Sequence, residues 1–439
     1  MLRALRSWQL RRRRAGRFAL LERLLSAQSI TAAELADRQR RDFDAMARYA
    51  AANTDYYARR FAASLPDADL RVEPSALPIL DRQDVIDNLS AMLVRDADPA
   101  TTRLGYTGGS TGRPMAFYYN EAKHELMLAG MMRGFMMSGW RPGDKVLYLW
   151  GASRDTMRGG VFGHAGSGLL DTEKTVAAFE LSEIRLREWA DTIRNWRPTL
   201  LYGYASVLGE LARYVIDERI RLPRSLLGVY ATAEVLHDWQ RDLMQRAFGC
   251  RAYNQYGCRE VPNIAWECRA GGMHVFSDMV HLEAEPIDGE RHLVVSSLSD
   301  RLMPFIRYDT GDIGHLIEGE CACGSPFPTM HMSLCRHNDL IRTPNGRQLH
   351  PAYFNQLLYG MTQVHRYQWV QTSPSCLQLN LVGRQIAEAD IQAIRAALRR
   401  DIDPAMSLVV RYLDEIPRTA AGKHRFVIGL CAESFGACP

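Results

Sequence analysis

No apolar run in the 439-residue sequence approaches the length of a membrane-spanning helix, which needs about 20 consecutive apolar residues. A secretory signal is not expected either, because no apolar segment follows the arginines near the start. Internal repeats and low-complexity linkers are also lacking. We therefore expect a cytoplasmic protein with no membrane span.

The sequence has no strong excess of charge, since 54 Lys and Arg residues stand against 50 Asp and Glu residues. Such a near-balance predicts no general affinity for nucleic acid or for an anionic membrane. The local exception is an arginine run from Arg11 to Arg14. Apolar residues from Leu10 to Leu25 have helical spacing, so the run is interpreted as the solvated face of an amphipathic helix. The alternatives are a phosphate site, a transit peptide or a nucleic-acid site with steep salt dependence.

Cysteine is too scarce for a secreted disulfide scaffold, with nine residues in the whole chain. Four residues have the chemistry of a zinc site: Cys268, His274, and the Cys-x-Cys pair of Cys321 and Cys323. Three thiolates and one imidazole complete a tetrahedral set without an open position, which indicates a structural metal. The alternative is four unrelated side chains, two of them buried thiols.

The order of the predicted elements favours an α/β protein. Residues 1 to about 62 are predicted as helices, and Thr31 to Glu34 has the form of a capping box. From about 100 to 320, strand-like runs alternate with helical patterns, which is typical of largely parallel sheets flanked by helices. From about 340 onward, three strand-like runs and one helical pattern predict a compact α+β unit.

A loop rich in glycine and hydroxyl residues, YTGGSTGRP, runs from Tyr106 to Pro114. Its small side chains would let backbone N–H groups approach phosphate oxygens, and its hydroxyls add further donors. It does not match the Walker A pattern, because no Lys-Ser or Lys-Thr pair closes it. On its own, such a cluster is also typical of a surface loop.

Two later segments carry residues suited to a nucleotide. NQYGCRE, from Asn254 to Glu260, holds Tyr256, which could stack on a purine, and Glu260 itself, which could reach a phosphate-bound Mg²⁺. In RYDTGDIG, which begins at Arg307, Asp312 could accept hydrogen bonds from two ribose hydroxyls. A core tyrosine and a turn aspartate are the alternatives.

A fourth segment, IPRTAAGKH, places Lys423 on a glycine-containing loop near the end of the sequence. A mobile lysine is a compact point charge, suited to pairing with a carboxylate and an α-phosphate while they react. The alternative is an ordinary surface lysine.

In this order and at this spacing, the four segments resemble the acyl-adenylate-forming superfamily, and its phenylacetate–CoA ligase family is the most similar branch. The resemblance runs from the helical start through Lys423. It implies a large N-terminal adenylate-forming domain, residues 1–336, with mixed and parallel sheets flanked by helices. A small, mobile α+β domain, residues 337–439, would follow. ATP, Mg²⁺ and coenzyme A are the implied cofactor and substrates.

The resemblance also assigns roles to individual residues. Lys423 would be the adenylation lysine, and Glu260 the second catalytic residue, through Mg²⁺. Arg336 and Asp339 would lie in the hinge region. Some members of the family have a cysteine–histidine site beside the ribose motif, which favours zinc at the cluster described above. The implied nucleotide-binding residues are Thr107, Gly108, Gly109, Ser110, Thr111, Gly112, Glu234, Tyr256, Gly257, Asp312 and Arg336.

Three positions depart from the family pattern. Arg113 ends the phosphate loop where lysine is commoner, and Asp309 stands where a basic residue is usual. Cys335 replaces a glycine before the hinge arginine, which removes easy access to positive φ. The last change puts reorientation of the C-terminal domain, and hence the second half-reaction, in doubt.

The predicted function is ATP-dependent activation of a carboxylic acid as acyl-AMP, followed by transfer to coenzyme A. An aryl or arylacetic acid is favoured, with pocket walls expected from residues 135–140, 202–205 and 231–233. One alternative acceptor is an amine or a carrier-protein thiol in natural-product or polysaccharide biosynthesis. A non-catalytic zinc-stapled binding protein is the other alternative. No nucleic-acid partner is expected, and a homodimer is the expectation from the family.

Overall fold

The computed structural model describes residues 2–107, 115–150, 170–178, 180–287, 289–334, 363–416 and 426–430, with short stretches between 341 and 361. Helices occupy the first part of the chain, as predicted, and the capping box is confirmed: the Thr31 hydroxyl accepts from the Glu34 N–H at 3.2 Å, while the Glu34 carboxylate accepts from the Thr31 N–H at 2.8 Å. The N-terminal helices are α1 (Leu2–Arg13), α2 (Ala15–Ser26), η1 (Ala27–Ser29), α3 (Ala32–Asn53), α4 (Asp55–Arg60), η2 (Pro74–Ala76) and α5 (Arg82–Asp87).

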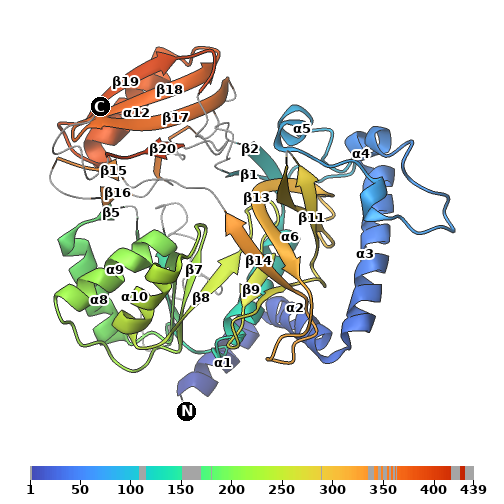
Figure 1. Cartoon of the computed structure of the whole chain (residues 1–439), viewed down its shortest axis with the longest axis horizontal. Helices are drawn as coiled ribbons and strands as arrows, with labels where there is room; N and C mark the ends of the chain where they lie inside the picture. Colours follow the sequence, from blue (N-terminus) through green and yellow to red (C-terminus); the bar gives the residue numbers. More distant parts are fainter. Residues whose placement is uncertain are drawn as a thin grey trace.

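A mixed sheet of eleven strands forms the centre of the molecule (Figure 1), in the order β11-β12-β13-β14-β10-β9-β8-β7-β6-β3-β4. Five of these strands are parallel: β3 (Val146–Trp150), β4 (Glu173–Ala177), β6 (Leu200–Tyr204), β7 (Gly228–Thr232) and β8 (Arg251–Tyr256). The inner strands β3, β6 and β7 are buried on both faces, as is usual for parallel strands, whereas β4 at the edge is partly exposed. The α/β fold class is therefore confirmed.

Helices cover the two faces of the parallel strands. Tyr202 and Tyr230 share a buried cluster with Phe135 of α6 (Glu121–Met136). Their strand neighbours Leu201 and Ala231 belong to a second cluster on the opposite face. Side chains that alternate along a strand point to opposite faces, which explains the division. The helices of the second cluster are α8 (Glu183–Trp196), α9 (Ala205–Asp217) and α10 (Asp238–Phe248).

The remaining part of the large sheet is antiparallel, whereas the sequence predicted largely parallel strands up to about residue 320. Hairpin connections account for the difference; one of them turns at Gly289, where φ is +84°. The antiparallel strands are β9 (Ala265–Glu267), β10 (Met273–Val275), β11 (Val280–Ile287), β12 (Glu290–Ser297), β13 (Tyr308–Ile317) and β14 (Thr329–Leu334).

Two small sheets accompany the large one. A hairpin pairs β1 (Arg103–Thr107) with β2 (Met115–Tyr119) and thereby holds both ends of the predicted phosphate loop. A second sheet has the order β15-β16-β5. Its strands are β5 (Glu180–Leu181), β15 (Ile341–Arg342) and β16 (Gln348–Leu349).

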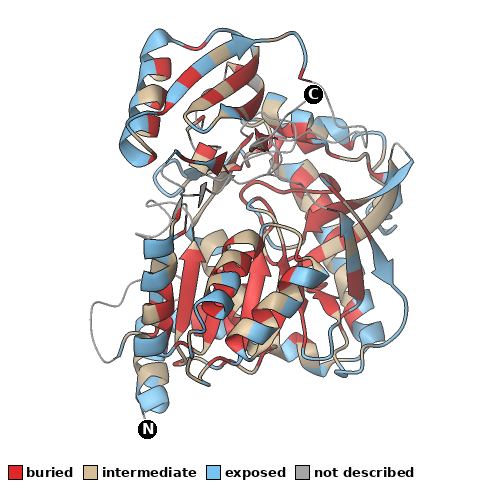
Figure 2. Cartoon of the chain, turned by 60° about the vertical axis from the view of Figure 1, so that its left-hand side comes forward, coloured by how far each residue is buried: buried red, intermediate tan, exposed pale blue. Residues whose placement is uncertain are grey.

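A four-stranded sheet with one helix forms the last part of the chain, and its elements confirm the predicted α+β unit. It has its own buried cluster, which includes Tyr367, Trp369 and Leu398. The unit lies at the opposite end of the molecule from α1 (Figures 1 and 2). The predicted boundary after residue 336 falls outside the described residues and stays a prediction. The elements are β17 (Val364–Ser373), β18 (Cys376–Gly383), α12 (Glu388–Asp401), β19 (Ser407–Tyr412) and β20 (Val427–Ile428), in the strand order β19-β18-β17-β20.

Candidate functional site

Two of the predicted nucleotide motifs meet through a buried phenol. The Tyr256 hydroxyl, at the end of β8, donates to Asp312 Oδ2 at 3.0 Å and lies 3.1 Å from Thr310 Oγ1. Burial and the nearby Asp312 carboxylate raise the pKa of Tyr256 well above its usual value. The phenol therefore stays protonated and can donate to Asp312 at any physiological pH. Three strands separate β8 from β13 in the sheet order, so this contact reaches across a curved sheet.

Glu260 is almost fully buried, at 1% exposure, and follows Tyr256 by four positions. One carboxylate oxygen, Oε1, accepts a hydrogen bond from the Tyr308 hydroxyl at 3.0 Å. The other, Oε2, has no hydrogen-bond partner among the described residues. A buried carboxylate oxygen of this kind can take a water or a cation, and hard oxygen donors are the ones Mg²⁺ prefers. Glu260 therefore fits its predicted role as a magnesium ligand.

The base of the predicted phosphate loop lies beside these residues. Thr107 is buried at the end of β1, and its carbonyl accepts from the Arg82 guanidinium at 3.3 Å. Arg259, next to Glu260, donates to the Tyr106 carbonyl at 3.0 Å. The loop residues Gly108, Gly109, Ser110, Thr111 and Gly112 themselves lie outside the described residues.

Glu234 follows β7, whose parallel neighbour β8 ends at Tyr256, so the two residues share one edge of the sheet. Its carboxylate accepts from the Ser206 N–H at 2.7 Å and lies 3.1 Å from the Ser206 hydroxyl, in the first turn of α9. An acidic group at a helix N-terminus is favourable, and this contact orients Glu234.

Gly257, in the same motif as Tyr256, has no room for a side chain. A Cβ there would lie 2.9 Å from the Asn263 backbone nitrogen.

The four predicted zinc ligands converge. Cys268, His274, Cys321 and Cys323 place their ligand atoms within 4.8 Å of one another. The Cys268 and Cys321 sulfurs lie 3.7 Å apart, and Cys323 Sγ lies 3.2 Å from His274 Nε2. Tetrahedral zinc with Zn–S bonds of about 2.3 Å would separate two sulfurs by about 3.8 Å. The donor set and its spacing therefore fit zinc.

The β9–β10 hairpin and the residues around it position the four ligand side chains. The hairpin of β9 and β10 supplies Cys268 and His274, and Gly272 leaves room for the thiols, since a Cβ there would stand 2.7 Å from Cys321 Sγ. His274 Nδ1 lies 2.9 Å from the Phe327 carbonyl. Burial, partly offset by that contact, lowers the pKa of His274, so the ring is neutral and directs the Nε2 lone pair at the cluster.

No family model matches the sequence, but individual proteins do. Protein CapK from Staphylococcus aureus is 24% identical over 360 residues, which cover 80% of this chain and 79% of that protein. A phenylacetate–coenzyme A ligase from Thermus thermophilus is 23% identical over 397 residues, which cover 81% and 86%. The chain is therefore similar in sequence to phenylacetate–CoA ligases. A solved 2-hydroxyisobutyryl-CoA ligase in complex with its acyl-AMP and CoA shares the fold of this phenylacetate–CoA ligase-like chain, with a TM-score of 0.59, 18% identity and coverage of 92% and 91%.

Several residues that the resemblance assigns lie outside the described part of this phenylacetate–CoA ligase-like chain. They are Lys423, Arg336 and Asp339, together with the departures Arg113 and Cys335. Their roles stay predictions. Asp309, the third departure, is described: its carboxylate lies 3.0 Å from His292 Nδ1 and accepts from the Gly311 N–H at 2.8 Å. The Asp309 carboxylate therefore stabilises the backbone of β13 next to Gly311.

The expected pocket walls of this phenylacetate–CoA ligase-like chain divide between the two faces of the sheet. Phe135 and Tyr202 pack edge to face, with ring centroids 5.5 Å apart. The ring centroid of Trp266 lies 5.4 Å from that of Phe135 and 6.4 Å from that of Tyr202. Ala205 and Ala231 instead pack in the cluster on the opposite face. The aromatic wall residues are therefore packed as core, together with Trp266, which lies outside the expected ranges.

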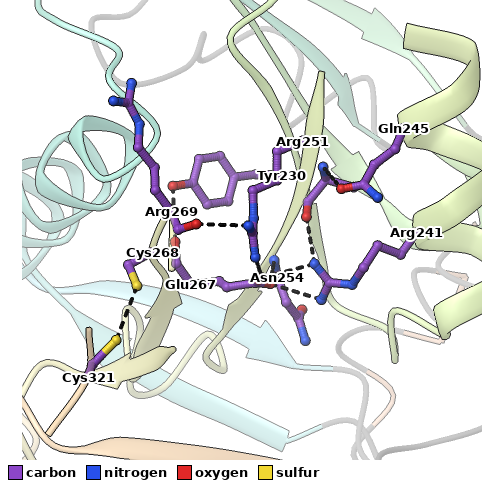
Figure 3. Close-up of polar contacts among 10 residues, drawn as sticks. Tyr230, Arg241, Gln245, Arg251, Asn254, Glu267, Cys268, Arg269 and Cys321 are labelled. Carbon is purple, nitrogen blue, oxygen red and sulfur yellow. Dashed lines mark hydrogen bonds and ion pairs between the residues drawn. The ribbon is translucent and has the colours of Figure 1, made fainter. Parts of the chain in front are cut away.

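Sequence reasoning missed Glu267, which connects the cysteine cluster to the nucleotide strand (Figure 3). Its carboxylate, 3% exposed, receives two hydrogen bonds from Arg241, both 2.9 Å long. It also accepts from the Asn254 N–H at 2.8 Å, on β8. The only available signal was its place directly before Cys268. Tyr308, the donor to Glu260, was missed as well, because apolar and polar roles of a tyrosine have the same sequence pattern.

Proposed function

We propose that the chain activates a carboxylic acid with ATP and transfers the acyl group to coenzyme A. The observation that carries the proposal is a pair of buried contacts to one strand: Tyr256 donates to Asp312 of β13, and Glu260 accepts from Tyr308 of the same strand. Tyr256, Glu260 and Asp312 come from two motifs that are distant in sequence, and their side chains supply an aromatic face, a cation ligand and a ribose acceptor. The named relatives, which include phenylacetate–CoA ligases, support the same chemistry.

In the first step, a carboxylate oxygen of the acid bonds to the α-phosphorus of ATP, and the bond from that phosphorus to pyrophosphate breaks. Asp312 would accept hydrogen bonds from the ribose hydroxyls while Tyr256 holds its carboxylate in place. Glu260 would hold Mg²⁺, which when bound neutralises phosphate charge as pyrophosphate leaves. Lys423 would pair with the acid and the α-phosphate, a role that rests on the sequence motif.

In the second step, the thiol sulfur of coenzyme A bonds to the acyl carbon, AMP leaves, and the thiol proton passes to solvent. An aryl or arylacetic acid is the proposed substrate class, a proposal supported by the phenylacetate–CoA ligases among the relatives and by the aromatic residues Phe135 and Tyr202 in the predicted wall segments. A structural zinc ion at Cys268, His274, Cys321 and Cys323 completes the proposal. It would keep the β9–β10 hairpin in register.

The substitution Asp312→Asn tests the ribose contact. A hydrogen bond to a charged group contributes about 1.5–3 kcal/mol, so the KM for ATP should rise by about tenfold to a hundredfold. The matched control is Glu318→Gln, an exposed carboxylate just beyond the same strand, which should leave this KM unchanged. Initial-rate kinetics of pyrophosphate release would measure both variants. An unchanged KM for Asp312→Asn would remove the ribose assignment.

A further inference from the structure

Helix α1 leaves most of its apolar side chains outside the protein core. Leu2, Leu5 and Trp8 are 46%, 48% and 55% exposed, and Leu10 is the only buried residue of the helix. The three exposed residues recur every third position, so they lie on one side of the helix. Figure 2 shows α1 at the end of the molecule that carries the N label, with most of its length exposed or half-buried.

The same helix carries a local concentration of positive charge. Residues 2–13 contain five arginines and no acidic residue, although the whole sequence is nearly balanced. Arg12, four positions after Trp8, places its guanidinium 5.0 Å from the centre of the indole ring. Arg11 pairs with Glu22 at 2.8 Å, a contact between two exposed side chains that solvent screens. The arginines of α1 therefore flank its exposed apolar side chains and form a positively charged border around them.

This combination matches the chemistry of an anionic lipid surface. Leucine and tryptophan side chains enter the boundary between headgroups and acyl chains, while arginines reach the phosphates. A nucleic acid would use the arginines and leave Leu2 and Leu5 without a role. A second copy packed symmetrically on α1 would bring five arginines against five, which opposes that contact.

We propose that α1 docks the protein reversibly on an anionic membrane through Leu2, Leu5, Trp8 and the surrounding arginines. The helix lies at the end of the molecule opposite the sheet of β17, β18 and β19 (Figure 1), so docking leaves that end of the protein in solvent. None of the helices in the described part of the chain is long and apolar enough to cross a bilayer, so the contact is peripheral.

Flotation of the full chain with vesicles tests the proposal. We expect binding to phosphatidylglycerol–phosphatidylcholine vesicles, weak binding to phosphatidylcholine alone, and loss of binding in high salt. The double variant Leu5→Glu/Trp8→Glu should abolish binding. Its matched control is Ile184→Glu/Trp239→Glu, two exposed apolar residues on α8 and α10, which should bind as the unmodified protein does. Arg12→Gln/Arg13→Gln should weaken binding by about thirtyfold and reduce its salt dependence.

Three outcomes would overturn the proposal. The first is equal flotation with anionic and zwitterionic vesicles, or none with either. The second is equal loss of binding in the control double variant. The third is a dimer that Leu5→Glu/Trp8→Glu converts to a monomer without lipid, which would show that a second copy covers α1. Circular dichroism and pyrophosphate release should be unchanged in this variant, so its result is separable from the proposed ligase function.

Discussion

At the scale of single residues, the site depends on hydroxyl groups that orient carboxylates. Tyr256 donates to Asp312, and Tyr308 donates to Glu260. The sequence motifs predicted Tyr256, Glu260 and Asp312 as site residues, but not these pairings. A pattern of residues along the chain does not show which side chains meet after the sheet curves. Tyr308 therefore had no recognisable role until the fold placed it against Glu260.

The substitution Tyr308→Phe removes the donor to Glu260 and keeps the ring in the core. Loss of one hydrogen bond of about 1 kcal/mol should raise the half-saturating Mg²⁺ concentration by about fivefold. Magnesium titrations of pyrophosphate release would measure the change. Tyr412→Phe is the control, because its hydroxyl accepts from the Ile386 N–H in the C-terminal sheet. Equal Mg²⁺ dependence in Tyr308→Phe and the unmodified protein would contradict a positioning role.

At the scale of elements, buried charges connect helices to the sheet. Arg133 of α6 is fully buried, and its guanidinium contacts Asp278 at 2.7 and 2.9 Å and the Leu24 carbonyl at 3.0 Å. The same guanidinium lies 3.9 Å from the centre of the Phe276 ring. One side chain thus joins α6 and α2 to the segment between β10 and β11.

Arg133→Ala should lower the free energy of unfolding by about 3–5 kcal/mol, because the Asp278 carboxylate would stay buried without its partner. Urea denaturation would measure this loss. The control is Arg185→Ala, which breaks the pair with Glu188, whose two side chains are 49% and 53% exposed. That change should cost less than about 1 kcal/mol. Similar losses in both variants would contradict a structural role for the buried pair.

The cysteine cluster was predicted as a ligand set, but its geometry was not. Cys268 and His274 meet because a short hairpin of β9 and β10 connects them, and the sequence pattern did not predict that hairpin. Each strand has only three residues, which is too short for a periodic signal. The thiols of the distant Cys-x-Cys pair then complete the set.

Cys321→Ser should reduce bound zinc and thermal stability together, because metal binding contributes directly to folding. Elemental analysis should find about one zinc per chain before the substitution. Cys376→Ser, at a half-buried thiol on β18, is the matched control and should retain the metal. Purified unmodified protein without zinc, or zinc content unaffected by Cys321→Ser, would contradict the structural metal site.

At the scale of the whole molecule, the sequence predicted the order of the units better than the layout of the sheet. The α+β unit at the end was predicted because its strands and helix α12 have clear periodicity. The antiparallel half of the large sheet was missed, since strands in hairpins and strands in crossovers have similar composition. The predicted wall residues fall into two clusters because neighbouring strand residues face opposite sides, as Tyr230 and Ala231 do.

The central claim is adenylation followed by thioester formation. Pyrophosphate release from ATP, measured across aryl, arylacetic and aliphatic acids with and without coenzyme A, tests it most directly. We predict release that requires an acid and Mg²⁺, an acyl-CoA product only when coenzyme A is present, and no release from Lys423→Ala. The exposed Lys174→Ala should behave as the unmodified protein. Adenylate formation without any acyl-CoA product in the presence of coenzyme A would indicate that an amine or a carrier-protein thiol is the acceptor in the second step. Absence of acid-dependent release, or normal release from Lys423→Ala, would contradict the account.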